Sequence, residues 1–433
     1  MTGSSPAPDR SADTGAESQD QRIDLPVAVA RVTARIARLG AERVSAADAR
    51  GQVLATPVRS EVFLPPWNNS AMDGYAVRGA DISTVPVTLS VLETVGAGAF
   101  PSRAVAAGQA TRIMTGAPVP EGADTVIRVE DTDGGIESVL IRDNRDSGKN
   151  VRPRGEDIAA GGVALAAGTT LGPAQLGVLA AIGADTVDVF RRPRVAILTS
   201  GDELVTPDRF AEVQSGRKIV SSNSVTLREL VLDAGGIPVD LGIAADTKES
   251  LREHLARAAD ADMLITSGGI SVGAFDYMRE VLVEMGATLD FWRVRIRPGA
   301  PIAVGALGGI PWLGLPGNPV STMVTFELFG RPAIRKLRGH DAIFRSTVAV
   351  TLDEPVKLAA DLTHFLRAVV TRHDGGRLTA RLTGTQSSGA LSSMAKANAL
   401  LIVPRGTIEM GAGEILRAIP LGSDTAYAAS FGS

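Results

Sequence analysis

The sequence predicts a multidomain protein of the α/β plus β class, with one α/β domain built on a parallel-type sheet and further β-rich domains. Three observations support this prediction. The chain has 433 residues, too many for one small module, since a domain typically has about 150 residues. From Pro193 the pattern changes to buried strands alternating with helices, and from Ser346 it returns to strands of alternating polarity.

Composition excludes several classes of function. Hydrophobic residues make up 44% of the chain and charged residues 21%, which is enough apolar surface for a core and too much for a disordered chain. The net charge of -4 provides no broad cationic field for nucleic acid or an anionic membrane. Because cysteine is absent, disulfides, thiolate nucleophiles and Cys-type zinc sites are excluded.

The first 22 residues are rich in Ser, Ala, Asp, Gly and Pro, so we expect 1–22 to be a disordered tail. They contain no apolar segment of a secretion signal, and no apolar run in the chain reaches the 18 residues of a spanning helix. We therefore expect a cytoplasmic protein. Apolar residues at helical spacing predict one amphipathic helix from Leu25 to about Leu39.

Residues 55–150 are predicted to form a β-rich domain. Alternating strands with turn signals are expected at 75–77, 87–91, 109–113, 125–129 and 139–141. A strand and a helix at 163–183 are expected to pack beside the first helix. We therefore assign 23–54 and 151–190 to one discontinuous N-terminal domain.

Residues 191–340 are predicted to form the α/β domain. The strands RVAILTS, IPVDLGIA and DMLITSGG alternate with helices near 223–234 and 248–258, which favours a parallel sheet covered by helices on both faces. The series continues with a helix at 277–285, strands at 289–296, 302–306 and 312–315, and a helix at 319–329. Residues 345–433 then show alternating strands separated by turns, typical of a small β-barrel or sandwich.

Four loops follow the strands of the predicted sheet, at the edge where open α/β sheets bind ligands. They contain Gly201-Asp202-Glu203, Asp246, the segment 268–276 and the segment 316–319. Amides at helix starts suit phosphate, and the carboxylates suit a hard cation such as Mg²⁺, so the loops indicate a phosphorylated or nucleotide ligand. As simple turns and a helix cap, the same residues would have only structural roles. We give the two interpretations about equal weight.

A second group of polar residues lies in the β-rich domain. Asp73 stands in the tight turn of SAMDGYA, and Thr115 stands beside the turn of RIMTGAP. Both residue types are common in turns, so a structural role is the simpler interpretation. The stretch KNVRPRGED, which ends at Asp157, is either a solvated loop or a basic patch for phosphate.

Taken together, these segments resemble the MoeA family of molybdopterin molybdenumtransferases, which includes the C-terminal domain of gephyrin. The resemblance covers the chain from about Ile23 onward and rests on SAMDGYA (70–76), RIMTGAPVPEGADTVIRVE (112–130), VRPRGEDI (151–158), SGDEL (200–204), ITSGGISVGAFDY (265–277), RPGAP (297–301) and LPGNP (315–319). It implies an elongated four-domain subunit with a three-layer, MogA-like α/β domain and a C-terminal β-barrel. It also implies a homodimer whose cleft joins the α/β domain of one subunit to the β-rich domain of the other.

The reaction implied by the resemblance takes adenylylated molybdopterin and molybdate, releases AMP with Mg²⁺ present, and leaves the metal on the dithiolene. A MogA-like adenylyltransferase is the implied partner. Matched residue by residue, the resemblance implies catalytic roles for Asp73, Thr115, Asp157, Glu203, Asp246 and Asp276, of which the last three are the expected Mg²⁺ ligands. It implies substrate-binding roles for Ser267, Gly268, Gly269, Ser271, Gly273, Arg297, Pro316 and Pro319.

The sequence departs from the family pattern at the anion-binding loop. Arg297-Pro298-Gly299-Ala300-Pro301 stands where the family commonly has Lys-Pro-Gly-Lys-Pro, so one cation is exchanged and the other is missing. Ala274, Asn68 and His364 also replace residues that are usually acidic in the family. Two alternatives therefore stay open: a dimeric adaptor that binds peptides, as in gephyrin, and a transferase that uses tungstate instead of molybdate.

Overall fold

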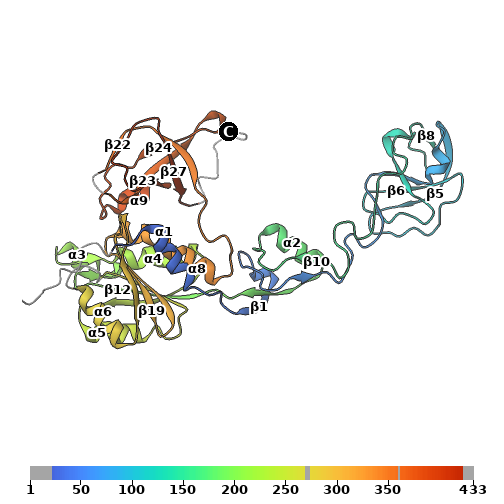
Figure 1. Ribbon diagram of the computed structural model, residues 1–433. Helices are drawn as coiled ribbons and strands as arrows, with labels where there is room; N and C mark the ends of the chain where they lie inside the picture. Colours follow the sequence, from blue (N-terminus) through green and yellow to red (C-terminus); the bar gives the residue numbers. More distant parts are fainter. Residues whose placement is uncertain (1–21, 269–273, 359–360, 423–433) are drawn as a thin grey trace, which may run out of the picture. The chain divides into compact units, whose positions relative to one another are not determined.

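The computed structural model describes residues 22–268, 274–358 and 361–422 (Figure 1). The chain divides into two compact units, Met1–Gly40 with Arg191–Ser433 and Ala41–Phe190. The second unit is therefore an insertion in the first. Within the first unit, the two ends of the insertion meet where the Arg191 amide donates to the Gly40 carbonyl oxygen at 3.0 Å. No helix among the described residues is long and apolar enough to span a membrane.

A six-stranded sheet forms the centre of the first unit, in the order β15-β12-β16-β20-β19-β17. The four strands β15 (Ile237–Ala244), β12 (Arg194–Ser200), β16 (Met263–Ser267) and β20 (Ile310–Leu315) are parallel. β19 (Pro301–Leu307) runs antiparallel to β20 and to β17 (Thr288–Arg293). The expected parallel sheet is therefore mixed, because only Gly308 and Gly309 connect β19 to β20. Both have positive φ, which suits a two-residue hairpin turn, whereas a parallel connection needs a long crossover.

Helices cover both faces of this sheet, which gives the expected three layers. Neighbouring strand residues point to opposite faces: Ile197 and Ile265 lie in one apolar cluster with Leu227 of α4 and Ile334 of α8, and Leu198 lies in another with α5 and α6. The helices are α4 (Ser222–Asp233), α5 (Lys248–Ala256), α6 (Ala274–Glu284), α7 (Pro319–Thr325) and α8 (Arg331–Leu337), with a π-helical segment (Phe326–Gly330) between the last two. Helical structure thus extends beyond the predicted end at 329.

Helix α1 (Leu25–Ala34) packs on this α/β core. Its buried residues Ala28 and Val32 belong to the apolar cluster that contains Phe329 and Ile334. We expected this helix to pack with 151–190 in a discontinuous domain. Instead, residues up to Gly40 belong to the first unit, because the apolar stripe of α1 is covered by the helices after β20. Residues 1–21 of the expected tail lie outside the described residues.

The C-terminal strands close into a barrel, as the resemblance implies. The order of the sheet is β18-β23-β24-β21-β27-β25, and β25 pairs again with β23. The strands are β18 (Ile296–Arg297), β23 (Thr363–Arg372), β24 (Leu378–Leu382), β21 (Val348–Leu352), β27 (Ile415–Pro420) and β25 (Ala399–Val403). β22 (Val356–Lys357) pairs with β26 (Glu409–Met410), and a short helix, α9 (Leu391–Lys396), precedes β25.

The second unit contains a five-stranded sheet in the order β7-β4-β6-β5-β8. Its strands β7 (Thr125–Arg128), β4 (Gly74–Val77), β6 (Gln109–Ile113), β5 (Val87–Val95) and β8 (Ser138–Ile141) match the five expected positions. Three two-stranded pairs complete the sheets of the unit: β3 (Asn69–Ser70) with β9 (Val151–Arg152), β2 (Val58–Arg59) with β10 (Val163–Leu165), and β1 (Ala41–Ser45) with β11 (Thr186–Phe190). Helix α2 (Pro173–Ala181) packs near the last pair.

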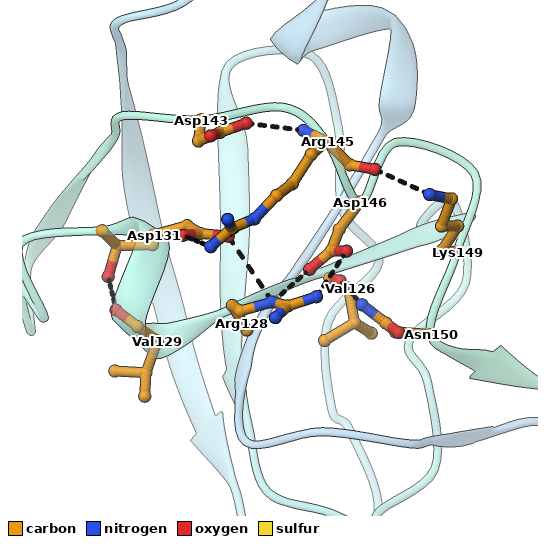
Figure 2. Close-up of polar contacts among 10 residues, drawn as sticks. Val126, Arg128, Val129, Asp131, Asp143, Arg145, Asp146, Lys149 and Asn150 are labelled. Atoms are coloured by element: carbon orange, nitrogen blue, oxygen red, sulfur yellow. Dashed lines mark hydrogen bonds and ion pairs between the residues drawn. The ribbon is translucent and has the colours of Figure 1, made fainter.

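An ion-pair network fixes the loop that leads to the basic stretch (Figure 2). The Arg128 guanidinium donates to both carboxylate oxygens of Asp146, at 2.8 and 2.9 Å, and these bonds lower the pKa of Asp146. Arg145 pairs with Asp131 in the same way. Lys149 donates to the Arg145 carbonyl oxygen at 3.0 Å. The first cation of the basic stretch therefore has a structural bond to the backbone.

Candidate active site

A pocket of about 470 Å³ lies at the carboxyl ends of β12 and β16, the edge at which open α/β sheets bind ligands. All four predicted loops contribute to it, and the first turn of α4 adds a fifth side. The predicted residues that line the pocket are Glu203, Asp246, Ser267, Gly268 and Pro319. The structure therefore brings together loops that are more than a hundred residues apart in the sequence.

One wall of the pocket is acidic. Asp202 and Glu203 follow β12, and the Asp246 amide donates to the Asp202 carboxylate at 3.0 Å. Burial raises the pKa of Asp246, and the negative charges of Asp202 and Glu203 raise it further. No ion pair joins these three carboxylates to a Lys or Arg side chain of the described residues. A described cation, Lys218, lies close by, and its Nζ donates to the Asp202 carbonyl oxygen.

Two of these carboxylates suit a hard cation. Mg²⁺ usually keeps several waters and binds one or two carboxylates, which Glu203 and Asp246 can supply. Among the described residues, no three acidic or histidine side chains are grouped closely enough to hold a metal ion alone. Asp276, the third expected ligand, lies in the first turn of α6, and its side chain is outside the described residues.

Another part of the pocket is polar and tightly bonded. The Asn223 amide nitrogen, in the first turn of α4, donates to Ser267 Oγ at 2.9 Å and to the Gly317 carbonyl oxygen at 2.8 Å. Ser267 Oγ in turn donates to the Pro316 carbonyl oxygen at 3.1 Å. Pro316 does not line the pocket, but its carbonyl oxygen holds Ser267, which does. Asn223 joins α4, the end of β16 and the 316–319 loop.

Two buried polar atoms of pocket residues, Ser200 Oγ and Asn223 Oδ1, have no hydrogen-bond partner among the described residues. A buried polar atom without a partner costs about 1–3 kcal/mol, so such atoms are rare unless a ligand or water completes them. Ser200 Oγ can donate or accept, and Asn223 Oδ1 can only accept. Both atoms are closed to solvent, so a ligand or a water reaches them only when neighbouring groups move.

The pocket requires a glycine at position 268. Gly268 has φ +91°, which side-chain-bearing residues rarely adopt, and a Cβ there would lie 2.4 Å from the Ser200 carbonyl oxygen. Its amide donates to the Leu315 carbonyl oxygen. The loop after β16 is therefore pressed against the end of β12. Gly269, Ser271 and Gly273, the other predicted residues of this loop, lie outside the described residues.

The predicted residues of the second unit form a separate pair and a lone carboxylate. The Asp73 carboxylate accepts hydrogen bonds from the Thr115 amide at 2.7 Å and from its hydroxyl at 2.8 Å. The amide bond, with the hydroxyl bond second, lowers the pKa of Asp73, so this carboxylate is ionised at neutral pH. Asp157 is exposed, and its amide donates to the Leu64 carbonyl oxygen. No described hydrogen bond joins Asp157 to the other two.

Arg297 does not line the pocket. It is exposed on β18, where its backbone pairs with His364 of the barrel. The residues that the sequence analysis missed are Ser200, Asn223 and the two serines before Asn223. The run SSNS at 221–224 was the available signal. Ser and Asn favour the starts of helices, and the start of a helix suits an anionic ligand. Helix α4 begins within this run.

Comparisons with known proteins agree on one family. Residues 23–183 match the MoeA N-terminal region (domains I and II), 196–336 match a probable molybdopterin-binding domain, and 349–421 match the MoeA C-terminal region (domain IV). A molybdopterin molybdenumtransferase of Nostoc is 39% identical over 378 residues, covering 84% of this chain and 85% of that protein. The molybdopterin molybdenumtransferase 2 of Mycobacterium tuberculosis is 38% identical and covers 86% and 92%.

Solved structures give the same result. The molybdopterin biosynthesis MoeA protein of Pyrococcus horikoshii matches with a TM-score of 0.80 and 27% identity, covering 92% of this chain and 99% of that one. The sequence match to the Nostoc enzyme and the matches to all three family regions extend over most of the chain. The chain therefore belongs to the MoeA family of molybdopterin molybdenumtransferases, and it is a transferase of molybdenum cofactor biosynthesis.

Proposed function

We propose that the pocket at the carboxyl edge of the sheet binds adenylylated molybdopterin, and that the chain inserts molybdate-derived metal into it with release of AMP. The observation that carries this proposal is that carboxylates, Glu203 and Asp246, and neutral polar residues, Ser200 and Asn223, line one pocket. A phosphorylated ligand with a polar ring system uses both kinds of group. Relatives at 33–39% identity are named molybdopterin molybdenumtransferases.

Cleavage of a phosphoanhydride-type bond requires orientation and neutralised charge more than covalent help from the protein. Glu203 and Asp246 would hold Mg²⁺, which supplies the positive charge that the phosphate oxygens need. Ser200 Oγ would donate to the ligand and Asn223 Oδ1 would accept from it once these closed side chains turn toward the pocket. The backbone of Ser267 and Gly268 contacts the ligand. Their hydrogen bonds to the carbonyl oxygens of Pro316 and Leu315 hold these two residues in place.

The remaining expected residues have roles that we propose on the family resemblance. Asp73, Thr115 and Asp157 serve the reaction from the second unit, and Asp276 adds a third carboxylate to the Mg²⁺ site. Gly269, Ser271, Gly273 and Pro319 contribute to substrate binding, and Arg297 attracts molybdate. We also propose that the chain forms a homodimer and that a MogA-like adenylyltransferase supplies its substrate. The five predicted domain segments stay part of the proposal, except that the first helix belongs with the α/β domain.

The test is AMP release and active-cofactor formation from adenylylated molybdopterin by the purified chain, with Mg²⁺, in the presence of molybdate, of tungstate or of neither. We expect molybdate-dependent turnover, and a loss of about 100-fold in Glu203→Gln and Asp246→Asn, because one charge-stabilising group is typically worth 10²–10³ in rate. Glu253→Gln is the matched control, since it removes the same charge from an exposed position on α5 that does not line the pocket.

Full activity in both carboxylate variants would contradict the proposed roles. Turnover with tungstate but not with molybdate would show that the chain is a transferase that uses tungstate. Binding of substrate without turnover would favour the adaptor interpretation, which the named relatives do not favour.

A further inference from the structure

A second pocket in the first unit shares no residue with the candidate active site. Its volume is about 370 Å³, and it is lined by Asp233, Arg331, Arg335, Arg345, Ser346 and Pro420. Asp233 is the last residue of α4, whereas Asn223 of the active site lies in the first turn of that helix. The two pockets are therefore separated by most of the length of α4, about 15 Å at 1.5 Å per residue.

Two of the three arginines are balanced by carboxylates. The buried Glu327 accepts from Arg331 Nε and from Arg345 Nε, each at 2.7 Å. Asp233 pairs with the same two arginines, at 2.7 and 3.4 Å. Two guanidinium groups thus face two carboxylates, and their charges cancel.

Arg335 is the third arginine, and it has only neutral partners. Its guanidinium donates to the Ala342 carbonyl oxygen at 3.1 and 2.9 Å and lies 3.4 Å from His340 Nδ1. His340 is neutral at pH 7, because burial and the nearby Arg335 and Arg338 lower its pKa to about 4. Burial, followed by the charges of Arg331 and Arg345, lowers the pKa of Arg335. The pocket therefore carries one positive charge that no described carboxylate neutralises.

An apolar cavity adjoins this cationic pocket. It has a volume of about 280 Å³ and shares Asp233, Arg331 and Arg345 with the cationic pocket. Its other lining residues are the Glu327 carboxylate, which both arginines already neutralise, and apolar residues that include Met323, Met394 and Leu400. A ligand that fills both spaces has one anionic end and one apolar end.

We propose that the two spaces together bind a phosphomonoester. The planar guanidinium fork suits the oxygens of a phosphate dianion, and Arg335, Arg345 and the exposed Ser346 surround the place where it binds. The organic group of the ligand lies against Met323, Met394 and Leu400. The Asp233 side chain is 61% exposed, so its carboxylate can turn to water when the phosphate binds.

The test is isothermal titration of the full chain with phenyl phosphate and with inorganic phosphate, at low salt and pH 7.5. We expect phenyl phosphate to bind more tightly than inorganic phosphate, because only phenyl phosphate has a group for the apolar cavity. Arg335→Gln should weaken binding about 10-fold or more, since a charge-assisted hydrogen bond is worth about 1.5–3 kcal/mol. Asp233→Asn should strengthen binding, because it removes a negative charge from the pocket.

Arg252→Gln is the matched control. It removes the same charge from α5, where Arg252 pairs with Glu284 at 2.7 Å. An equal loss of affinity in this control would overturn the proposal, as would weaker binding in Asp233→Asn, equal binding of both probes, or no binding of either. AMP release by Arg335→Gln should equal that of the unmodified chain, which separates this proposal from that for the active site.

Discussion

Replacing Asn223 by Ala removes the side chain that joins three segments of the candidate active site. The amide nitrogen bonds to Ser267 Oγ at 2.9 Å and to the Gly317 carbonyl oxygen at 2.8 Å, and the residue is only 9% exposed. A buried hydrogen bond contributes about 0.5–1.5 kcal/mol net, so losing two costs about 1–3 kcal/mol. Ser267 retains its bond to Pro316, which favours the middle of that range.

A loss of about 2 kcal/mol corresponds to a change of about 30-fold in the equilibrium for local opening. We expect this change in hydrogen exchange of the amides of Gly268 and Thr322, which donate to the carbonyl oxygens of Leu315 and Asn318. Mass spectrometry of peptide fragments that cover 263–268 and 316–322 measures it. Amides in the barrel should exchange as before, since local opening is confined to contiguous segments.

The control is Asn318→Ala, which removes the same type of side chain from the same pocket without removing a capping bond. Its exchange should change by less than about twofold, because exposed substitutions usually stay within about 0.5 kcal/mol. If both variants exchange at the same rate, the bonds of Asn223 do not hold the pocket together, and the reasoning fails.

Three further predictions test other parts of the structure. Gly268→Ala should destabilise the first unit by about 2 kcal/mol, measured by denaturant unfolding, because of the strained φ and the contact with the Ser200 carbonyl oxygen; an unchanged midpoint would contradict it. Thr115→Val should raise the pKa of Asp73 in a carboxyl NMR titration, since one of the two bonds that lower it is lost; a further fall would refute this. The depressed pKa of His340, about 4, means that the unfolded chain binds more protons below about pH 6.5, so stability should fall between pH 6.5 and 4. His340→Gln should flatten the profile of Tm against pH in this range. An unchanged slope would mean that other groups cause the loss of stability.

The sequence predicts most of the fold because buried strands and amphipathic helices leave strong periodic signals. The strands of the parallel core and of the five-stranded sheet lie close to their expected positions. The errors arose where distant contacts decide the outcome. The apolar stripe of α1 indicates a buried face but not which partner covers it. The direction of β19 depends on the Gly308-Gly309 turn, whereas the alternation of strands and helices predicts a parallel series.

The candidate site was predictable to the extent that it follows from strand order. Loops after parallel strands share one edge, so Glu203, Asp246, Ser267 and Gly268 could be grouped from the sequence. Asn223 leaves only the weak signal of the SSNS run, and the unpartnered polar atoms of Ser200 and Asn223 become visible only in the three-dimensional structure. Arg297 carries a charge typical of anion binding, but its position on β18 depends on pairing with the barrel.

The insertion of the second unit makes the chain divisible. Gly40 and Arg191 are bonded across the boundary of the first unit, and β1 pairs with β11 on the other side of the boundary. Domains whose ends lie side by side tolerate excision and transplantation. A shortened chain that joins Gly40 to Arg191 through a few glycines should therefore keep the pocket and the barrel while lacking Asp73 and Thr115. Adding back residues 41–190 as a separate polypeptide would then assign each step of the reaction to one unit or the other.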